Sequence, residues 1–174
     1  MSNHDLTNVD FSKLPSCGDF DFRIARDGTW FYRGSPIGRK PLVRLFSTVL
    51  RRENDGSFWL VTPVERGRIT VDDAPFVAVE LQVTGAGSAQ NLAFRTNVED
   101  WVTVDADHPL RVEQRPGGEP SPYVRVRGAL DALIARPVFY QLVDLAESRV
   151  SEKGEELGVW SGGAYFPLGM AEAA

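Results

Sequence analysis

The residues that could do acid–base or metal chemistry gather at one place in this chain. Asp105, Asp107 and His108 stand within four residues of one another. A metal or acid–base site there would need further ligands, yet the sequence holds only one other histidine, His4, so a histidine-rich zinc site is excluded. The spacing favours an Asx turn that joins two strands. We therefore expect no catalytic residue, no metal site and no cofactor.

A second kind of chemistry, the binding of anions, is indicated by arginines that directly precede glycines. Arg33 and Arg127 both stand in this position, where the glycine lets the backbone approach a ligand closely. If the two loops meet, their guanidinium groups, together with Arg39 or Arg136, would form a compact site for phosphate or carboxylate. The alternative is that each arginine pairs with an acid of the protein itself, such as Glu65.

Composition limits the classes of protein to which the chain can belong. With 174 residues, 43% of them hydrophobic and 25% charged, it reads as a globular protein of one domain or two small packed ones. A net charge of −5 argues against general nucleic-acid binding. Residues 23–52, however, hold eight cations and one acid. This basic segment is a solvated helix face, an anion-facing surface or a basic half that docks on an acidic half.

The first part of the chain predicts a hairpin and a helix. Residues 1–19 read as a flexible N-terminal arm. Alternation over residues 20–24, a turn at Gly28 and a β-rich return over 29–33 predict a hairpin. Pro41 can occupy the first turn of a helix whose apolar face continues to Leu50. Residues 58–61, apolar on both faces, predict a central strand.

The remainder predicts short strands and a second strand–helix unit. Strands are expected over residues 68–71, 76–84, 91–96, 101–104 and 110–114. The breaker at residues 116–122 is expected to separate this sheet from the second unit. That unit comprises a strand over 123–126, a short helical turn over 129–135, a helix over 137–147 and a closing hairpin over 157–166.

The two strand–helix units match in order, which favours an internal duplication. Each has a strand, an Arg-Gly turn, a helix begun by Pro41 or Pro137, and a later strand with Trp59 or Trp160. We expect an α+β fold of two related strand-loop-helix-strand units around mostly antiparallel sheets. The expected domains are the arm over 1–19, a first unit over 20–72 and a larger second unit over 73–174.

Seven motifs together resemble a bacterial family, domain of unknown function 1285. They are DGTWFY (27–32), GSPI (34–37), LVTPVE (60–65), DAPF (73–76), FRTN (94–97), HPLRV (108–112) and YVRVRG (123–128). The resemblance covers residues 20–169. It implies a duplicated core, a C-terminal half that resembles a pleckstrin-homology roll, a cleft between the halves for a nucleotide-like ligand, and a role in signalling. It supplies no catalytic residues.

We therefore expect a non-catalytic ligand-binding or sensor protein, with an anionic, nucleotide-like ligand held between the halves. Arg33, Arg39, Arg127 and Arg136 would neutralise the anion, and Thr62, Asn97 and His108 would add hydrogen bonds. Trp30, Tyr32 and Trp59 either stack on a base or belong to the core.

Two other functions remain open. One is a protein-interaction module of the pleckstrin-homology type, and the other is an acid–base enzyme that uses Asp105, Asp107 and His108. No nucleic-acid or membrane partner is expected. A cytoplasmic location is expected because no apolar run reaches the roughly 18 to 20 residues of a membrane span and the N-terminus does not resemble a signal peptide.

Overall fold

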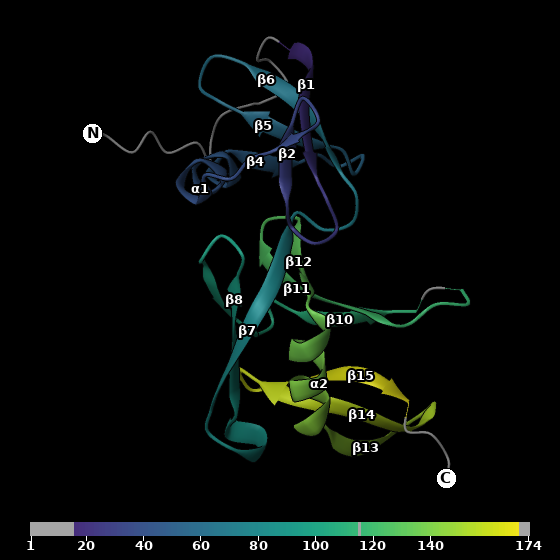
Figure 1. Ribbon diagram of the computed structural model, residues 1–174. Helices are drawn as coiled ribbons and strands as arrows, with labels where there is room; N and C mark the ends of the chain where they lie inside the picture. Colours follow the sequence, from purple (N-terminus) through teal and green to yellow (C-terminus); the bar gives the residue numbers. More distant parts are fainter. Residues whose placement is uncertain (1–15, 115, 171–174) are drawn as a thin grey trace.

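The computed structural model describes residues 16–114 and 116–170, which form a mostly β protein with two short α-helices (Figure 1). The part of the expected arm that spans residues 1–15 lies outside the described residues, and the first strand begins at Ser16. The chain is arranged in two halves, one above the other in Figure 1. No helix in the described ranges is long and apolar enough to cross a bilayer.

The first half is a six-stranded sheet with one helix. Its order, β3-β2-β1-β6-β5-β4, places β1 and β6 side by side in parallel, while the other pairs are antiparallel. Phe46 of the helix stacks on Trp30 at a ring distance of 6.2 Å, which fixes the helix on the sheet. The elements are β1 (Ser16–Ile24), β2 (Trp30–Tyr32), β3 (Ser35–Pro36), α1 (Lys40–Thr48), β4 (Leu50–Arg52), β5 (Phe58–Val61) and β6 (Arg66–Val71).

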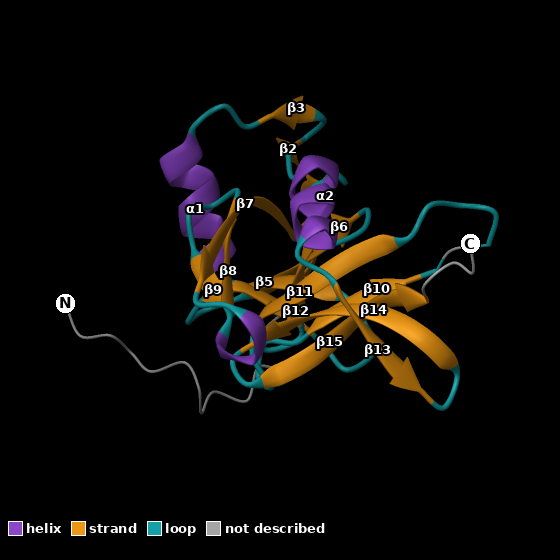
Figure 2. Cartoon of the chain, turned by 90° about the horizontal axis from the view of Figure 1, so that it is seen from below, coloured by secondary structure: helices purple, strands orange, loops and turns teal. Residues whose placement is uncertain are grey.

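The second half contains a six-stranded and a three-stranded sheet. Their orders are β10-β11-β12-β7-β8-β9 and β13-β14-β15, and β15 contacts β10 (Figure 2). The elements are β7 (Phe76–Thr84), the 3-10 turn η3 (Gly87–Ala89), β8 (Asn91–Thr96), β9 (Trp101–Thr103), β10 (Leu110–Glu113), β11 (Ser121–Arg127), β12 (Leu130–Ile134), α2 (Arg136–Asp144), β13 (Glu147–Ser151), β14 (Gly154–Ser161) and β15 (Ala164–Met170).

Two local predictions for this half are wrong. The expected helical turn over residues 129–135 is strand β12, in which Leu130, Ala132 and Ile134 are buried and the backbone pairs with both β11 and β7. Pairing with two neighbours outweighs the local helix propensity. The breaker at residues 116–122 does not separate two units, because β10 and β11 on either side of it pair within one sheet. It is the loop of a hairpin.

The order of elements is similar in the two halves. In the first half, β2 and β3 lead into α1 and then the antiparallel run β4-β5-β6; in the second, β11 and β12 lead into α2 and then β13-β14-β15. Each helix has nine residues and begins with a cation followed by proline. The two halves share this order, although the closing strands of the second form a separate sheet.

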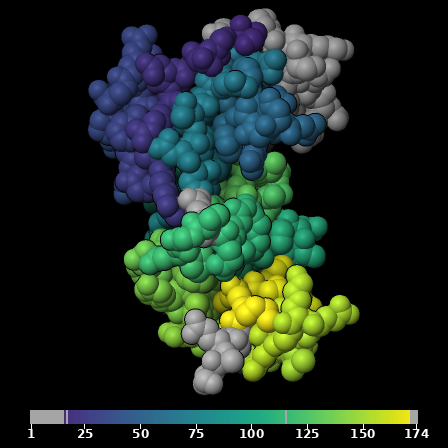
Figure 3. All heavy atoms as spheres, turned by 90° about the vertical axis from the view of Figure 1, so that its right-hand side faces the viewer, coloured from purple at the N-terminus to yellow at the C-terminus, as the bar shows by residue number. Residues whose placement is uncertain are grey.

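One hydrophobic cluster extends through both halves. Ile24, Trp30 and Leu50 from the first half belong to the same cluster as Phe76 and Phe94 from the second. In the space-filling view the blue first half rests on green segments of the second (Figure 3). Trp30, only 1% exposed, is therefore a core residue rather than a platform for a base.

Candidate ligand site between the two halves

A pocket of about 760 Å³ lies where the turn between β1 and β2 approaches the start of α2. We call it the inter-half pocket, because Arg26 comes from the first half and the other lining residues come from the second. These are Gly118, Glu119, Pro120, Ser121, Pro122, Leu133, Ile134, Ala135, Arg136, Phe139 and Tyr140. Its volume falls in the range of roughly 300 to 1,000 Å³ typical of small-molecule sites.

The start of α2 gives one wall of this pocket a positive character. Ala135 precedes the helix in an extended conformation and offers no side-chain cap, and Pro137 has no N–H group. The helix dipole places partial positive charge at this end, beside the guanidinium of Arg136. Arg136 pairs with Glu119 from the β10–β11 loop, and both side chains are largely exposed. This pair is thus open to replacement by an anion from solution.

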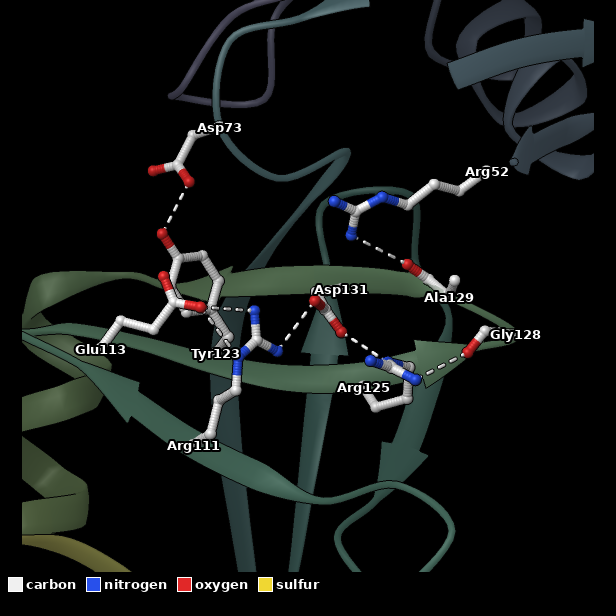
Figure 4. A network of polar contacts seen from close by, with 9 residues as sticks. All are labelled: Arg52, Asp73, Arg111, Glu113, Tyr123, Arg125, Gly128, Ala129 and Asp131. Atoms are coloured by element: carbon white, nitrogen blue, oxygen red, sulfur yellow. Dashed lines mark hydrogen bonds and ion pairs between the residues drawn. The ribbon is translucent and has the colours of Figure 1, made fainter. Parts of the chain in front are cut away.

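Arg26, the other cation of the pocket, is held by a buried acid. Its Nε lies 3.3 Å from the carboxylate of Asp73, whose side chain is 9% exposed. The hydroxyl of Tyr123 donates to the same carboxylate at 2.6 Å (Figure 4). Tyr123 stands in β11, one residue after Pro122 of the pocket wall. Asp73 therefore ties Arg26 of the first half to the sheet of the second.

Behind Tyr123, one buried carboxylate binds two arginines. Asp131 is 4% exposed and accepts hydrogen bonds from Arg111 at 2.8 Å and Arg125 at 2.7 Å (Figure 4). Burial alone would lower the pKa of Arg111, but the hydrogen bonds and charges of Asp131 and Glu113 outweigh it and raise that pKa. The Arg111 guanidinium also lies over the Tyr123 ring, 4.7 Å from its centroid. This network fixes the tyrosine that binds Asp73.

Arginines also hold the two halves together. Arg127 donates to the carbonyl of Ser47 in the last turn of α1, where unpaired carbonyls favour a cation. It also lies 3.8 Å from Asp100, and burial lowers the pKa of this arginine. Arg52 donates across the same boundary to the carbonyl of Ala129 at 3.4 Å.

Of the seven predicted ligand residues, Arg136 lines the inter-half pocket. Arg127 joins the halves, and the side chain of Asn97 donates to the Gly28 carbonyl and accepts from the Val77 N–H. The carbonyl of Arg39 accepts the first hydrogen bonds of α1. Arg33 and Thr62 line a different pocket within the first half. The structure thus distributes these residues over several places.

His108 lies in a turn with the acids beside it in sequence. Asp105 Oδ1 accepts from the backbone N–H of Asp107 at 2.9 Å and of His108 at 2.8 Å, and it contacts His108 Nδ1 at 2.9 Å. The predicted Asx turn between β9 and β10 is therefore present.

The sequence did not predict a site role for Arg26, Phe139 or Tyr140, nor the network around Asp131. Asp131 is a lone acid among the apolar residues of β12, and such a position indicates a buried charge with partners. The position of Asp131 thus indicates a buried charge, but the sequence does not show which residues pair with it.

Taken together, the fold and the site define a mostly β protein of two halves, with a pocket of ligand size lined by residues of both. The chain belongs to the DUF1285 family, as its motifs predicted. The model of the family's N-terminal domain, a domain of unknown function, matches residues 9–74, and that of its C-terminal domain, also of unknown function, matches residues 75–168.

Two solved structures are similar to this chain. A DUF1285 family protein from Silicibacter pomeroyi DSS-3 is 51% identical, with a TM-score of 0.85, and the match covers 94% of this chain and 88% of the other. A DUF1285 family protein from Shewanella baltica OS155 is 24% identical, with a TM-score of 0.55, and the match covers 71% of this chain and 91% of the other. This second similarity supports only the fold of the chain. No curated protein matches the chain.

Proposed function

We propose that this protein is a non-catalytic, cytoplasmic ligand-binding or sensor protein with a role in signal transduction. Its ligand is a small anionic, nucleotide-like molecule held in the inter-half pocket. The observation that supports this most is that the lining of a pocket of about 760 Å³ includes two cations, Arg26 of the first half and Arg136 of the second. A ligand there would contact both halves at once, so binding would respond to their relative position.

The charges and shapes of the pocket fit such a ligand. A phosphate group would replace Glu119 as the partner of Arg136 and lie near the positive end of α2. A base would lie against Phe139 and the exposed ring of Tyr140, beside apolar Leu133 and Ile134. Because Arg26 and Arg136 are both positively charged, the pocket favours an anion over a neutral molecule.

A second candidate is a protein-interaction module of the pleckstrin-homology type, and one observation favours it. Strand β13 is an edge strand whose residues Glu147, Ser148, Arg149 and Val150 are all exposed, Val150 by 83%. Such an edge can pair with a strand from another protein. We rank this function below ligand binding because the exposed edge does not indicate which other protein would pair with it. We propose neither a nucleic-acid nor a membrane partner.

Thermal unfolding in the presence of inorganic phosphate, adenosine, AMP, ADP and ATP tests the proposal. At a hundredfold excess over Kd, binding to the native state adds about 2.7 kcal/mol, which corresponds to roughly 5 °C or more in Tm. We expect the shift to grow with phosphate charge and to be lost in the Arg26→Ala/Arg136→Ala double variant. The control Arg149→Ala removes a cation on β13 and should keep the shift. The proposal fails if millimolar nucleotides leave Tm unchanged, or if the double variant responds like the wild type.

A further inference from the structure

Strand β13 lies at the edge of the three-stranded sheet and pairs with β14 along one side only (Figure 1). Ser151 and Gly154 flank the two-residue turn between these strands and so form a hydrogen-bonded pair. Because such pairs alternate along an antiparallel ladder, the N–H and C=O groups of Ser148 and Val150 point away from β14. The outer edge of β13 therefore presents backbone donors and acceptors to a further strand.

Two side chains of opposite charge stand on one face of this edge. Strand alternation places Glu147 and Arg149 on the same face, and Tyr165 contacts both. The Arg149 guanidinium lies 4.9 Å from the centroid of the Tyr165 ring, and the Tyr165 hydroxyl donates to the Glu147 carbonyl at 3.1 Å. Both charged side chains are exposed, and within residues 16–114 and 116–170 neither lies within ion-pairing distance of an opposite charge. A partner strand can therefore supply that charge.

We propose that β13 pairs with β13 of a second copy of this chain, antiparallel and about a two-fold axis at Ser148. In this register Glu147 of each copy lies opposite Arg149 of the other, at the positions of the ladder where side chains approach most closely. The outward backbone groups of Ser148 and Val150 are those that the register uses. Val150, whose side chain is 83% exposed in the single chain, lies opposite Ala146 of the second copy. The two three-stranded sheets then become one continuous sheet.

The charges disfavour the neighbouring registers. A shift by two residues in one direction places Arg149 opposite Arg149, and a shift in the other places Glu147 opposite Glu147, and like charges in these positions are destabilising. Charged side chains on an edge strand ordinarily keep other strands away, whereas these two fit their own copy in one register. The inference rests on the second candidate function, whose edge strand it uses, and it names the partner. The anion site between the halves does not depend on it.

Analytical ultracentrifugation of the full chain tests the inference. A single strand pair is a small interface, so we expect a monomer–dimer equilibrium with a dissociation constant on the order of 100 µM. The sedimentation coefficient should rise from that of a monomer to that of a dimer as the protein concentration passes through this value. A chain that remains monomeric at about 1 mM would overturn the proposal. That result would leave the anion site untouched, because the nucleotide titration tests that site by itself.

Charge variants test the register. Glu147→Arg and Arg149→Glu each place like charges opposite one another and should weaken self-association at least about tenfold. The double variant Glu147→Arg/Arg149→Glu restores opposite charges and should dimerise as the wild type does, and an equimolar mixture of the two single variants should form a heterodimer. Arg39→Glu makes the same change of charge at the start of α1 and should have no effect.

Single variants that associate like the wild type, or a double variant that stays monomeric, would overturn the proposed pairing. Matching Tm values for all variants in dilute solution would exclude a folding defect as the cause.

Discussion

Arg33 adopts a left-handed backbone conformation, with φ of 50°, at the first position of the two-residue turn between β2 and β3. Gly34 follows with φ of 79°, so both turn residues have the positive φ of a type I′ hairpin. Asparagine is the residue that this first position prefers, whereas a long side chain there costs about 1 kcal/mol or more. The strain at Arg33 is therefore a property of the turn that one substitution can remove.

Replacing Arg33 by asparagine should stabilise the protein. Relief of the left-handed strain exceeds the loss of the Tyr32 contact, which is worth about 0.5 kcal/mol, and we expect a net gain of roughly 0.5 kcal/mol in the free energy of unfolding. Urea denaturation measures it. Arg33→Ala is the matched control, because it loses the contact while keeping the strain, and it should bring no gain. Destabilisation by the asparagine variant would show that the turn is not strained at this residue.

The carboxyl group of Asp105 should make the stability of the protein depend on pH. Its hydrogen bonds with the His108 side chain and with the backbone N–H groups of His108 and Asp107 lower the pKa of the carboxyl in the folded state. A lowered folded pKa means that the contribution is present above the unfolded pKa of about 3.9 and is lost as pH falls through the folded value. Asp105→Asn keeps the acceptor oxygen but removes the charge. The wild type should therefore be the more stable protein at pH 5, and the difference should shrink as pH falls below the unfolded pKa of about 3.9.

Urea denaturation of both proteins across this range measures the effect. A difference that stayed constant from pH 5 to pH 2.5 would mean that the charge of Asp105 has no part in the stability of the turn.

At the scale of elements, Asp131 connects three strands of the second half. It lies in β12 and forms ion pairs with Arg111 of β10 and Arg125 of β11, and its side chain is 5% exposed. Asp131→Asn removes the charge that Arg111 and Arg125 share. Arg111, beside the tyrosine that binds Asp73, then keeps only Glu113 as an acidic partner. Because the arginines are partly exposed, we expect a loss of about 2 kcal/mol in the free energy of unfolding, below the 3 to 5 of a fully buried pair.

An exposed pair provides the control. Glu80→Gln breaks the contact of Glu80 with Arg95 at 2.6 Å, in which both side chains are partly exposed, and should cost less than about 1 kcal/mol. Similar losses for Asp131→Asn and Glu80→Gln would contradict a structural role for the buried network.

The elements show what the sequence could and could not predict. Both helices were predictable, because Pro41 and Pro137 each open an amphipathic run, and strands with clear alternation such as β8 were predictable as well. Strand β12 was not predictable, because its short apolar run is equally compatible with a helical turn. Its pairing with β7 and β11 makes it a strand.

The candidate site was less predictable for the same reason. Arg136 could be identified from its place at a helix start. Arg26 and Tyr140 line the same pocket only because the two halves pack together, and no local sequence pattern predicts that packing. For the basic segment 23–52, the sequence left open a solvated helix face, an anion-facing surface and docking on acids. The contacts of Arg26 with Asp73 and of Arg44 with Glu99 are of the last kind, whereas Arg23 pairs with Asp72 of the first half.

At the scale of the whole molecule, a shared core and cross-boundary arginines should make the two halves unfold together. One hydrophobic cluster includes residues of both, and Arg127 and Arg52 donate across the boundary. In a Trp101→Phe/Trp160→Phe variant, fluorescence reports only Trp30 and Trp59 of the first half, whereas circular dichroism reports the whole chain. The two midpoints in urea should coincide. Separate transitions would show two independent domains.

NMR tests most directly whether an anion binds between the two halves. Titration of ¹⁵N-labelled protein with ATP, with adenosine as the uncharged control, locates the bound ligand through the amide shifts. We predict that ATP shifts the amides of Arg26, Arg136, Phe139 and Tyr140, and that adenosine has a much smaller effect. Shifts confined to the basic surface of α1 and β4, or none at millimolar ATP, would contradict the claim.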